Sequence, residues 1–143
     1  MTSHQNQWKS TKVNEIQKLL GDFLGGPMTP EKIEGLLKLF PYNSEIVTQQ
    51  MIDDRLEVLP LMNQQVLASM QIPNLTKHLQ EVKVPILSIW GLSDQFIPIR
   101  GSETLENCCS DVRTISFKEC GHWVMIEKAD EFNNYCISFL KNS

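Results

Sequence analysis

The stretch from Val84 to Trp123 constrains the fold of this chain more than any other. Val84–Trp90 is a nearly continuous apolar run with a proline near its start, which is typical of a strand covered on both faces in a parallel sheet. Residues 101–109 can form a helix, and Val112–Phe117 shows the alternation of a second strand. This order of strand, helix and strand predicts an α/β fold with a parallel sheet.

A side chain capable of acid–base chemistry follows each predicted strand. Asp94 ends the sequence Gly91-Leu92-Ser93-Asp94 after the first strand, and His122 lies just after the second. Open α/β sheets bind ligands beyond the carboxyl ends of their strands, so the two side chains can meet although 28 positions separate them. The pair predicts two members of a catalytic triad, an acid and a base.

Both residues also have a simpler explanation. An aspartate after a strand glycine can cap the next turn, and a single histidine is more often structural or exposed than catalytic. These explanations stay open for Asp94 and His122. Their positions at the ends of successive strands favour the catalytic role.

The first part of the chain contains several short helical patterns and no convincing strand. Its apolar residues recur at the spacing of amphipathic helices. We expect helices over Thr11–Leu24, from Thr29 to Pro41, from Ser44 or Thr48 to Pro60, over about Met62–Met70 and over Leu75–Leu79. A last helix is expected over Ala129–Leu140, with these residues facing inward: Phe132, Tyr135, Cys136, Phe139 and Leu140. The chain is thus predicted to divide into a helical segment, residues 1–80, and an α/β segment, residues 81–143.

The composition and charge exclude several classes of function. With 41% hydrophobic and 21% charged residues in 143, the chain resembles an ordinary globular protein. Its net charge is −4 and its Lys and Arg residues are scattered, so we expect no nucleic-acid partner. The amino terminus lacks a basic start followed by an apolar core, and no apolar run approaches the length of a membrane span. We therefore expect a soluble, cytoplasmic protein without a membrane partner.

The cysteines do not form a metal-binding pattern. Cys108, Cys109, Cys120 and Cys136 lack the paired spacing of a zinc site. Cys120 and His122 are close in sequence, but no second pair supplies the remaining ligands. We expect reduced, structural thiols, no metal and no cofactor.

Three segments carry a resemblance to a known family: VPILSIWGLSD, FKECGHWVMIEKADEFNNYCISFL and, upstream, LLKLFPYNSEIVTQQMIDDR. They resemble the carboxyl-terminal half of an α/β-hydrolase. More narrowly, they are similar to the meta-cleavage-product hydrolases, which split a carbon–carbon bond in vinylogous 1,5-diketones formed by aromatic-ring breakdown. The resemblance covers roughly residues 14–141. It implies a partial α/β-hydrolase fold, in which residues 1–80 form the lid and residues 81–143 form the last two strand-helix units of the core.

The resemblance also implies roles for individual residues. Asp94 matches the triad acid, which holds the imidazole in one tautomer, and His122 matches the general base. Arg55 falls where the family has the arginine that pairs with the dienoate carboxylate, a task suited to a forked donor. Arg55 could equally be a solvated helix arginine, paired at the surface with neighbouring acids such as Asp53 or Glu57.

Three aromatic residues match pocket positions of the family. Trp123 corresponds to an indole beside the catalytic histidine, and Phe40 and Phe96 correspond to apolar walls around the far end of the substrate. The alternative is that all three pack in the core or the lid without touching substrate.

The chain departs from the family at the nucleophile. The family serine lies in a G-x-S-x-G elbow, and the oxyanion hole uses main-chain N–H groups of that elbow and of an earlier loop. Neither occurs in this sequence, because the nearest match, Gly91 to Gln95, lacks the second glycine and is soon followed by Pro98. Cys120 is a poor substitute nucleophile, since an extended segment does not present it as an elbow would.

Two functional classes follow from this departure. The chain is either part of a carbon–carbon bond or ester hydrolase, with little or no turnover alone, or a non-catalytic remnant that binds a small carboxylate or a protein through its lid. The strand Val84–Trp90 would also lack one neighbour of the family sheet. We expect that edge to pair with a second copy, to be covered by the lid helices, or to bind a partner that supplies the missing strands.

Overall fold

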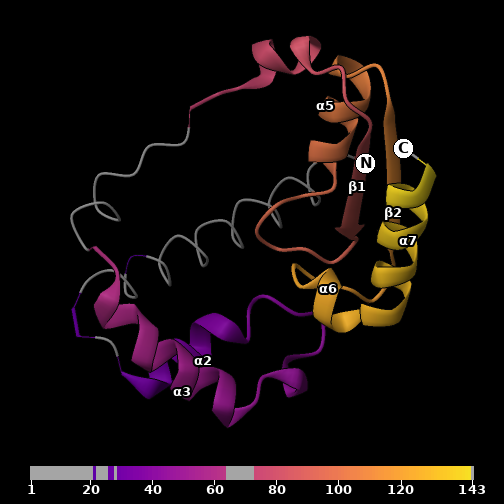
Figure 1. The fold of residues 1–143 in the computed structure, drawn as a ribbon. Helices are drawn as coiled ribbons and strands as arrows, with labels where there is room; N and C mark the ends of the chain where they lie inside the picture. The colour runs from indigo at the N-terminus through magenta and orange to yellow at the C-terminus, as the bar shows by residue number, and fades with distance from the viewer. Residues whose placement is uncertain (1–20, 22–25, 28, 64–72, 143) are drawn as a thin grey trace, which may run out of the picture. The chain divides into compact units, whose positions relative to one another are not determined.

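The computed structural model describes residues 21, 26–27, 29–63 and 73–142 (Figure 1). The chain forms two compact units. Unit 1 consists of Met1–Leu39 and Ser44–Met62, and unit 2 consists of Phe40–Asn43 and Asn63–Ser143. The helices predicted over Thr11–Leu24 and about Met62–Met70 lie almost wholly outside the described residues.

The described part of unit 1 is helical, as the sequence predicts. Helix α2, Pro30–Leu37, begins after Thr29, whose side-chain oxygen accepts a hydrogen bond from the main-chain N–H of Lys32. Its apolar side buries Ile33 and Leu37. The helix ends at Leu37, before the predicted limit at Pro41, and the N–H groups of Lys38 and Leu39 donate to the carbonyl oxygens of Glu34 and Leu36.

The second helix of unit 1 settles the choice between two N-caps. Helix α3, Gln49–Val58, is capped by Thr48, whose side chain accepts from the N–H of Met51. Ser44 instead begins a separate turn of 3-10 helix, η1, which spans Ser44–Ile46. A further 3-10 turn, η2, spans Leu59–Leu61.

Unit 2 contains the strand-helix-strand-helix order that the sequence predicts. The 3-10 helix η3, Thr76–Glu81, leads into the first strand. The remaining elements are β1 (Ile86–Gly91), α5 (Arg100–Cys108), β2 (Val112–Phe117), a short helix α6 (Val124–Glu127) and α7 (Ala129–Asn142). The two strands are parallel, with Ile86 opposite Val112 and Gly91 opposite Phe117. The predicted α/β class is confirmed.

Helices cover both faces of β1, which lies between α5 and α7 in Figure 1. Successive side chains of a strand point to opposite faces. Leu87 and Ile89 face α7, with which they line a common apolar groove. On the other face, a Cβ atom placed on Gly101 of α5 would lie 2.8 Å from the ring of Trp90. The glycine thus lets α5 approach the indole closely.

Two details of the sequence prediction need correction. The strand begins at Ile86 and not at Val84, which is 66% exposed. Leu140 lines a groove with Leu87 and Ile89 of β1, but the groove is open and leaves its side chain 74% exposed. Among the described residues, β1 pairs only with β2. Within the described part of the chain, no helix is both long and apolar enough to cross a membrane.

Candidate active site

Asp94 and His122 lie in direct contact in unit 2. Nδ1 of His122 is 2.8 Å from Oδ2 of Asp94. The other carboxylate oxygen accepts hydrogen bonds from the main-chain N–H groups of Phe96 and Ile97, at 2.8 and 2.9 Å. The Asp94 side chain is only 6% exposed, whereas the imidazole is 30% exposed. Asp94 therefore caps its turn and binds the histidine at the same time, so its two explanations are compatible.

The loops after β1 and β2 approach closely enough to bring these side chains together. The main-chain N–H of Ser93 donates to the carbonyl oxygen of Cys120 at 2.9 Å. A Cβ atom on Gly91 would overlap the carbonyl oxygens of Cys120 and Gly121. Glycine at position 91 is therefore required by this close approach.

A third segment, Phe40–Asn43, joins the two loops. The N–H of His122 donates to the carbonyl oxygen of Phe40 at 2.7 Å. A Cβ atom on Gly121 would overlap that oxygen and lie 2.7 Å from main-chain atoms of Pro41 and Tyr42. Three stretches of main chain that are distant in sequence thus meet at the histidine.

Two of the three aromatic residues that the sequence singled out, Phe40 and Phe96, lie beside the imidazole, and the third, Trp123, stacks on Phe40. Phe40 is stacked between Phe96 and Trp123, with ring centroids 4.5 and 5.1 Å apart and interplanar angles of 14° and 9°. The centroid of the His122 ring lies 5.5 Å from that of Phe40 and 5.7 Å from that of Phe96. All four rings are partly exposed. Whether the aromatic rings contact a substrate stays a prediction.

Arg55 belongs to unit 1, on helix α3. Its side chain is exposed. Two of the acids near it in sequence, Asp53 and Asp54, accept hydrogen bonds from the side chains of Gln49 and Gln50, at 2.9 and 2.7 Å. The predicted carboxylate-binding role of Arg55 stays a prediction.

Cys120 is buried next to the histidine loop and is not activated. It is fully inaccessible to solvent, and its thiol lies 3.8 Å from a carboxylate oxygen of Glu127. Burial, with the negative charge of Glu127, raises the pKa of Cys120 to about 11. The thiolate is the nucleophilic form, so this shift argues against Cys120 as the nucleophile. The described residues include no group of three or more side chains that could hold a metal ion.

Glu127 is a site residue that the sequence analysis missed. Its Oε1 accepts a hydrogen bond from the N–H of Gly121 at 2.8 Å, and its Oε2 accepts one from the N–H of Tyr42 at 2.7 Å. The available signal was an acid five positions after the histidine, in GHWVMIE. A helical turn at that point returns such a side chain to the histidine loop.

Comparison with known proteins places these features in context. A family model described as alpha/beta hydrolase fold matches residues 4–129. The 2-hydroxy-6-oxo-6-phenylhexa-2,4-dienoate hydrolase of Comamonas testosteroni is 32% identical over 119 residues, covering 78% of this chain and 42% of that protein. The 2-hydroxy-6-oxononadienedioate/2-hydroxy-6-oxononatrienedioate hydrolase of Burkholderia vietnamiensis is 28% identical, over 79% of this chain and 42% of the relative.

Solved structures agree on the fold. A meta-cleavage product hydrolase from Pseudomonas fluorescens IP01 matches with a TM-score of 0.71 and 24% identity, over 87% of this chain and 50% of that structure. The 2-hydroxy-6-oxo-6-phenylhexa-2,4-dienoate hydrolase from Rhodococcus sp. strain RHA1 gives a TM-score of 0.68 and 20% identity, over 89% and 49%. The chain spans less than half the length of the Comamonas and Burkholderia relatives, 42% of each. The predicted resemblance to the carboxyl-terminal half of meta-cleavage-product hydrolases is confirmed.

Proposed function

Because the chain belongs to the α/β-hydrolase fold family, we propose that it supplies the acid and the base of a hydrolase active site. The hydrogen bond of 2.8 Å between Asp94 and His122 carries this proposal. With Nδ1 bound to the carboxylate, Nε2 is the ring nitrogen that takes a proton from a nucleophile and returns it to a leaving group. Asp94 keeps the imidazole in that tautomer and stabilises its charged form.

We propose a meta-cleavage dienoate as the substrate class. Two considerations support this choice: relatives are named for hydrolysis of such dienoates, and a stack of three aromatic rings lies beside the imidazole through Phe40 and Phe96. Phe40, Phe96 and Trp123 would bind the apolar part of the substrate. The assignment of its carboxylate to Arg55 rests on the resemblance alone.

The isolated chain is proposed to be inactive or nearly so. The printed sequence contains no G-x-S-x-G elbow, and the relatives are more than twice as long as the matched region. The elbow provides both the nucleophile and part of the oxyanion hole, and each contributes separately to the rate. In this proposal residues 1–80 act as the lid, residues 81–143 complete the core, and the nucleophile comes from another segment.

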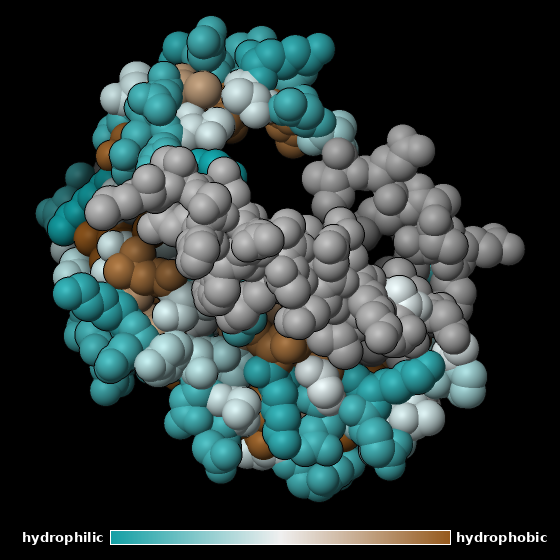
Figure 2. Space-filling view, turned by 180° about the vertical axis from the view of Figure 1, so that it is seen from behind, coloured by the Kyte–Doolittle hydropathy of each residue, from teal (hydrophilic) through white to brown (hydrophobic). Residues whose placement is uncertain are grey.

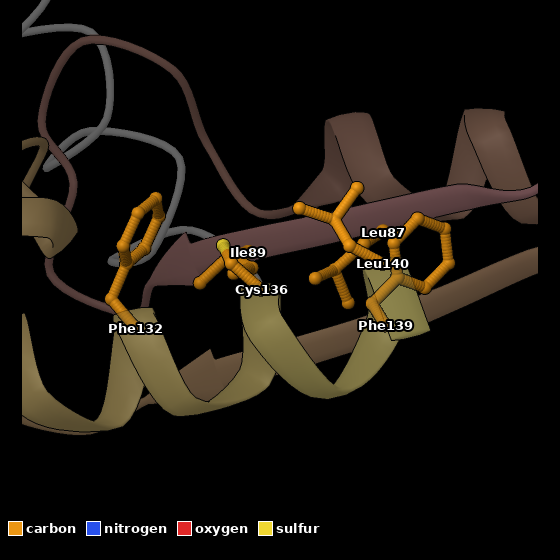
Figure 3. A pocket seen from close by; sticks show the side chains of 6 residues that line it. All are labelled: Leu87, Ile89, Phe132, Cys136, Phe139 and Leu140. Atoms are coloured by element: carbon orange, nitrogen blue, oxygen red, sulfur yellow. The ribbon is translucent and has the colours of Figure 1, made fainter. Parts of the chain in front are cut away.

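We propose that the segment supplying the nucleophile, here called the complementary core segment, binds to the face of β1 that is turned toward α7. Leu87 and Ile89 of β1 and four residues of α7 line an open apolar groove there (Figure 3): Phe132, Cys136, Phe139 and Leu140. Figure 2 shows hydrophobic residues exposed among hydrophilic ones on the opposite face of the molecule from that seen in Figure 1. Among the described residues, the second edge of β1 pairs with no strand. An apolar groove beside an open parallel edge suits a strand-helix segment of the same fold.

The first experiment measures turnover with and without such a segment. The chain is assayed on 2-hydroxy-6-oxo-6-phenylhexa-2,4-dienoate alone, and after co-expression with the unmatched amino-terminal part of the Comamonas relative. We expect no turnover by the chain alone and turnover by the complex that is lost in His122→Ala. Turnover by the isolated chain, abolished by His122→Ala, would contradict the proposed inactivity. A stable complex that binds the dienoate without converting it would favour the non-catalytic alternative.

The second experiment tests the groove with two substitutions on one helix. Leu140 lines the groove, whereas Ile137 is also exposed on α7 but does not line it. We expect Leu140→Asp to prevent co-purification of the complementary segment and Ile137→Asp to leave it unchanged. Equal effects of both substitutions would show that the groove is not the binding face. Self-association of the chain alone, lost in Leu140→Asp, would instead indicate a second copy as the occupant.

A further inference from the structure

We propose that Glu127 is a positioning residue for the general base, a role that rests on the proposed function of His122. In the described part of the chain, the hydrogen bonds of Glu127 go to neither the imidazole nor Asp94. It binds two main-chain N–H groups, one in the histidine loop and one in the segment that carries Phe40. Through these it fixes the main chain on two sides of the imidazole.

The short helix α6 explains how Glu127 reaches the histidine loop. The helix begins immediately after Trp123, and the N–H of Glu127 donates to the carbonyl oxygen of Trp123 at 2.9 Å. One helical turn advances the chain by only about 5 Å. The side chain of residue 127 therefore lies beside the residues that precede the helix, within 2.8 Å of the N–H of Gly121.

The contacts of Glu127 require a carboxylate. Its two oxygens accept from two different amides, those of Gly121 and Tyr42, which are far apart in sequence. A glutamine has one oxygen acceptor, and its NH₂ group would face one of these N–H groups as a second donor. Hydrogen bonds to an ionised acceptor are also shorter and stronger than those to a neutral one. Glu127→Gln should therefore lose at least one of the two links while keeping nearly the same shape.

The two amides determine the position of the imidazole through their neighbours. Gly121 directly precedes His122, and Tyr42 follows Phe40 by two residues. The N–H of His122 donates to the carbonyl oxygen of Phe40. Glu127 thus links Gly121 to Tyr42, next to the main-chain hydrogen bond between His122 and Phe40. Loss of one link should let the loop move and weaken the contact between Nδ1 and Asp94.

A purely structural role for Glu127 predicts a different result. Such a role would lower the stability of the chain but leave the imidazole of the folded molecules unchanged. A positioning role predicts that the tautomer populations of His122 change in molecules that are still folded. The imidazole ¹⁵N resonances report these populations directly.

The test uses the full chain labelled with ¹⁵N-histidine and with ¹⁵N at the main-chain amides. In the wild type we expect His122 as one tautomer, protonated at Nδ1, and slow hydrogen exchange at Gly121 and Tyr42. In Glu127→Gln we expect a mixture of tautomers and exchange at least about tenfold faster at one or both amides. Glu131→Gln removes the charge of an exposed acid in the first turn of α7 and should change neither signal.

Two further variants make the outcome decisive. Asp94→Asn serves as the reference for a lost acid–base contact. Glu127→Asp retains the charge but is too short to reach both amides, and it replaces Glu127→Gln if the latter does not fold. Wild-type His122 signals in a folded Glu127 variant, or free exchange at Gly121 and Tyr42 in the wild type, would overturn the proposal. The ¹⁵N signals and the exchange rates are measured without substrate, so they test the role of Glu127 alone. An inactive complex would instead indicate that the proposed function is wrong.

Discussion

The carboxylate of Asp94 joins the end of its own turn to the imidazole of His122, a residue from the next strand-loop unit. Oδ2 meets Nδ1 of His122 at 2.8 Å, and Oδ1 accepts from the N–H groups of Phe96 and Ile97. One side chain thus performs a local and a long-range task. A substitution can remove the contact with His122 while the hydrogen bonds of the turn are kept.

Asp94→Asn should separate the two tasks. The asparagine oxygen can still accept from the turn amides, so we expect the free energy of unfolding to fall by no more than about 1–2 kcal/mol. Its NH₂ group, facing Nδ1, should favour the opposite tautomer of His122. In a reconstituted complex we expect a loss of turnover on the order of 10⁴-fold. Urea unfolding and imidazole ¹⁵N spectra measure the two effects, and an unchanged tautomer would contradict this account.

Gly121→Ala should disrupt the meeting point of the three main-chain segments. The added methyl group would overlap the carbonyl oxygen of Phe40, so we expect destabilisation of about 1–3 kcal/mol. Gly35→Ala is the matched control, because a Cβ atom there has no neighbour within 4 Å and position 35 lies within α2. That substitution should stabilise the chain by about 0.5–1 kcal/mol. Urea unfolding measures the free energy of unfolding of both variants. Equal changes in the two would show that the close approach at Gly121 does not affect stability.

The stability of the chain should depend on Cys120 at alkaline pH. Burial and Glu127 raise the pKa of this thiol from an ordinary value of 9.0 to about 11. Because the pKa is higher in the folded chain than in the unfolded chain, the protonated thiol contributes to the free energy of unfolding. This contribution is complete below pH 9.0 and is lost as the pH rises through about 11. We expect a loss of at most about 2–3 kcal/mol across this window. Cys120→Ala, compared by urea unfolding at pH 8 and 11, should lack this part of the pH dependence.

Phe40→Leu should change the environment of the imidazole. Removing the central ring of the stack eliminates two aromatic contacts, each worth about 0.5–1.5 kcal/mol beyond buried area, and the ring current acting on His122. We expect the His122 ring protons to shift in the NMR spectrum. Phe117→Leu is the control, because Phe117 packs edge-on against Tyr135. A shift of the His122 signals of similar size in Phe117→Leu would contradict a local effect.

The elements of the fold could be predicted because their signals are local. Thr29 and Thr48 cap their helices, and the alternation of Val112–Phe117 gave the exact bounds of β2. Asp94 and His122 could also be predicted, since each directly follows a strand and parallel strands end at the same edge of a sheet.

The sequence by itself determined the order of strands and helices in unit 2, the contact between Asp94 and His122, and the family resemblance. Only the tertiary structure decided that Glu127 binds Tyr42, 85 positions away, and that Phe40 is stacked between Phe96 and Trp123. It also decided the start of β1 and the exposure of Leu140. The physical reason is that periodicity and capping act over a few residues, whereas these contacts depend on which distant segments the folded main chain brings together.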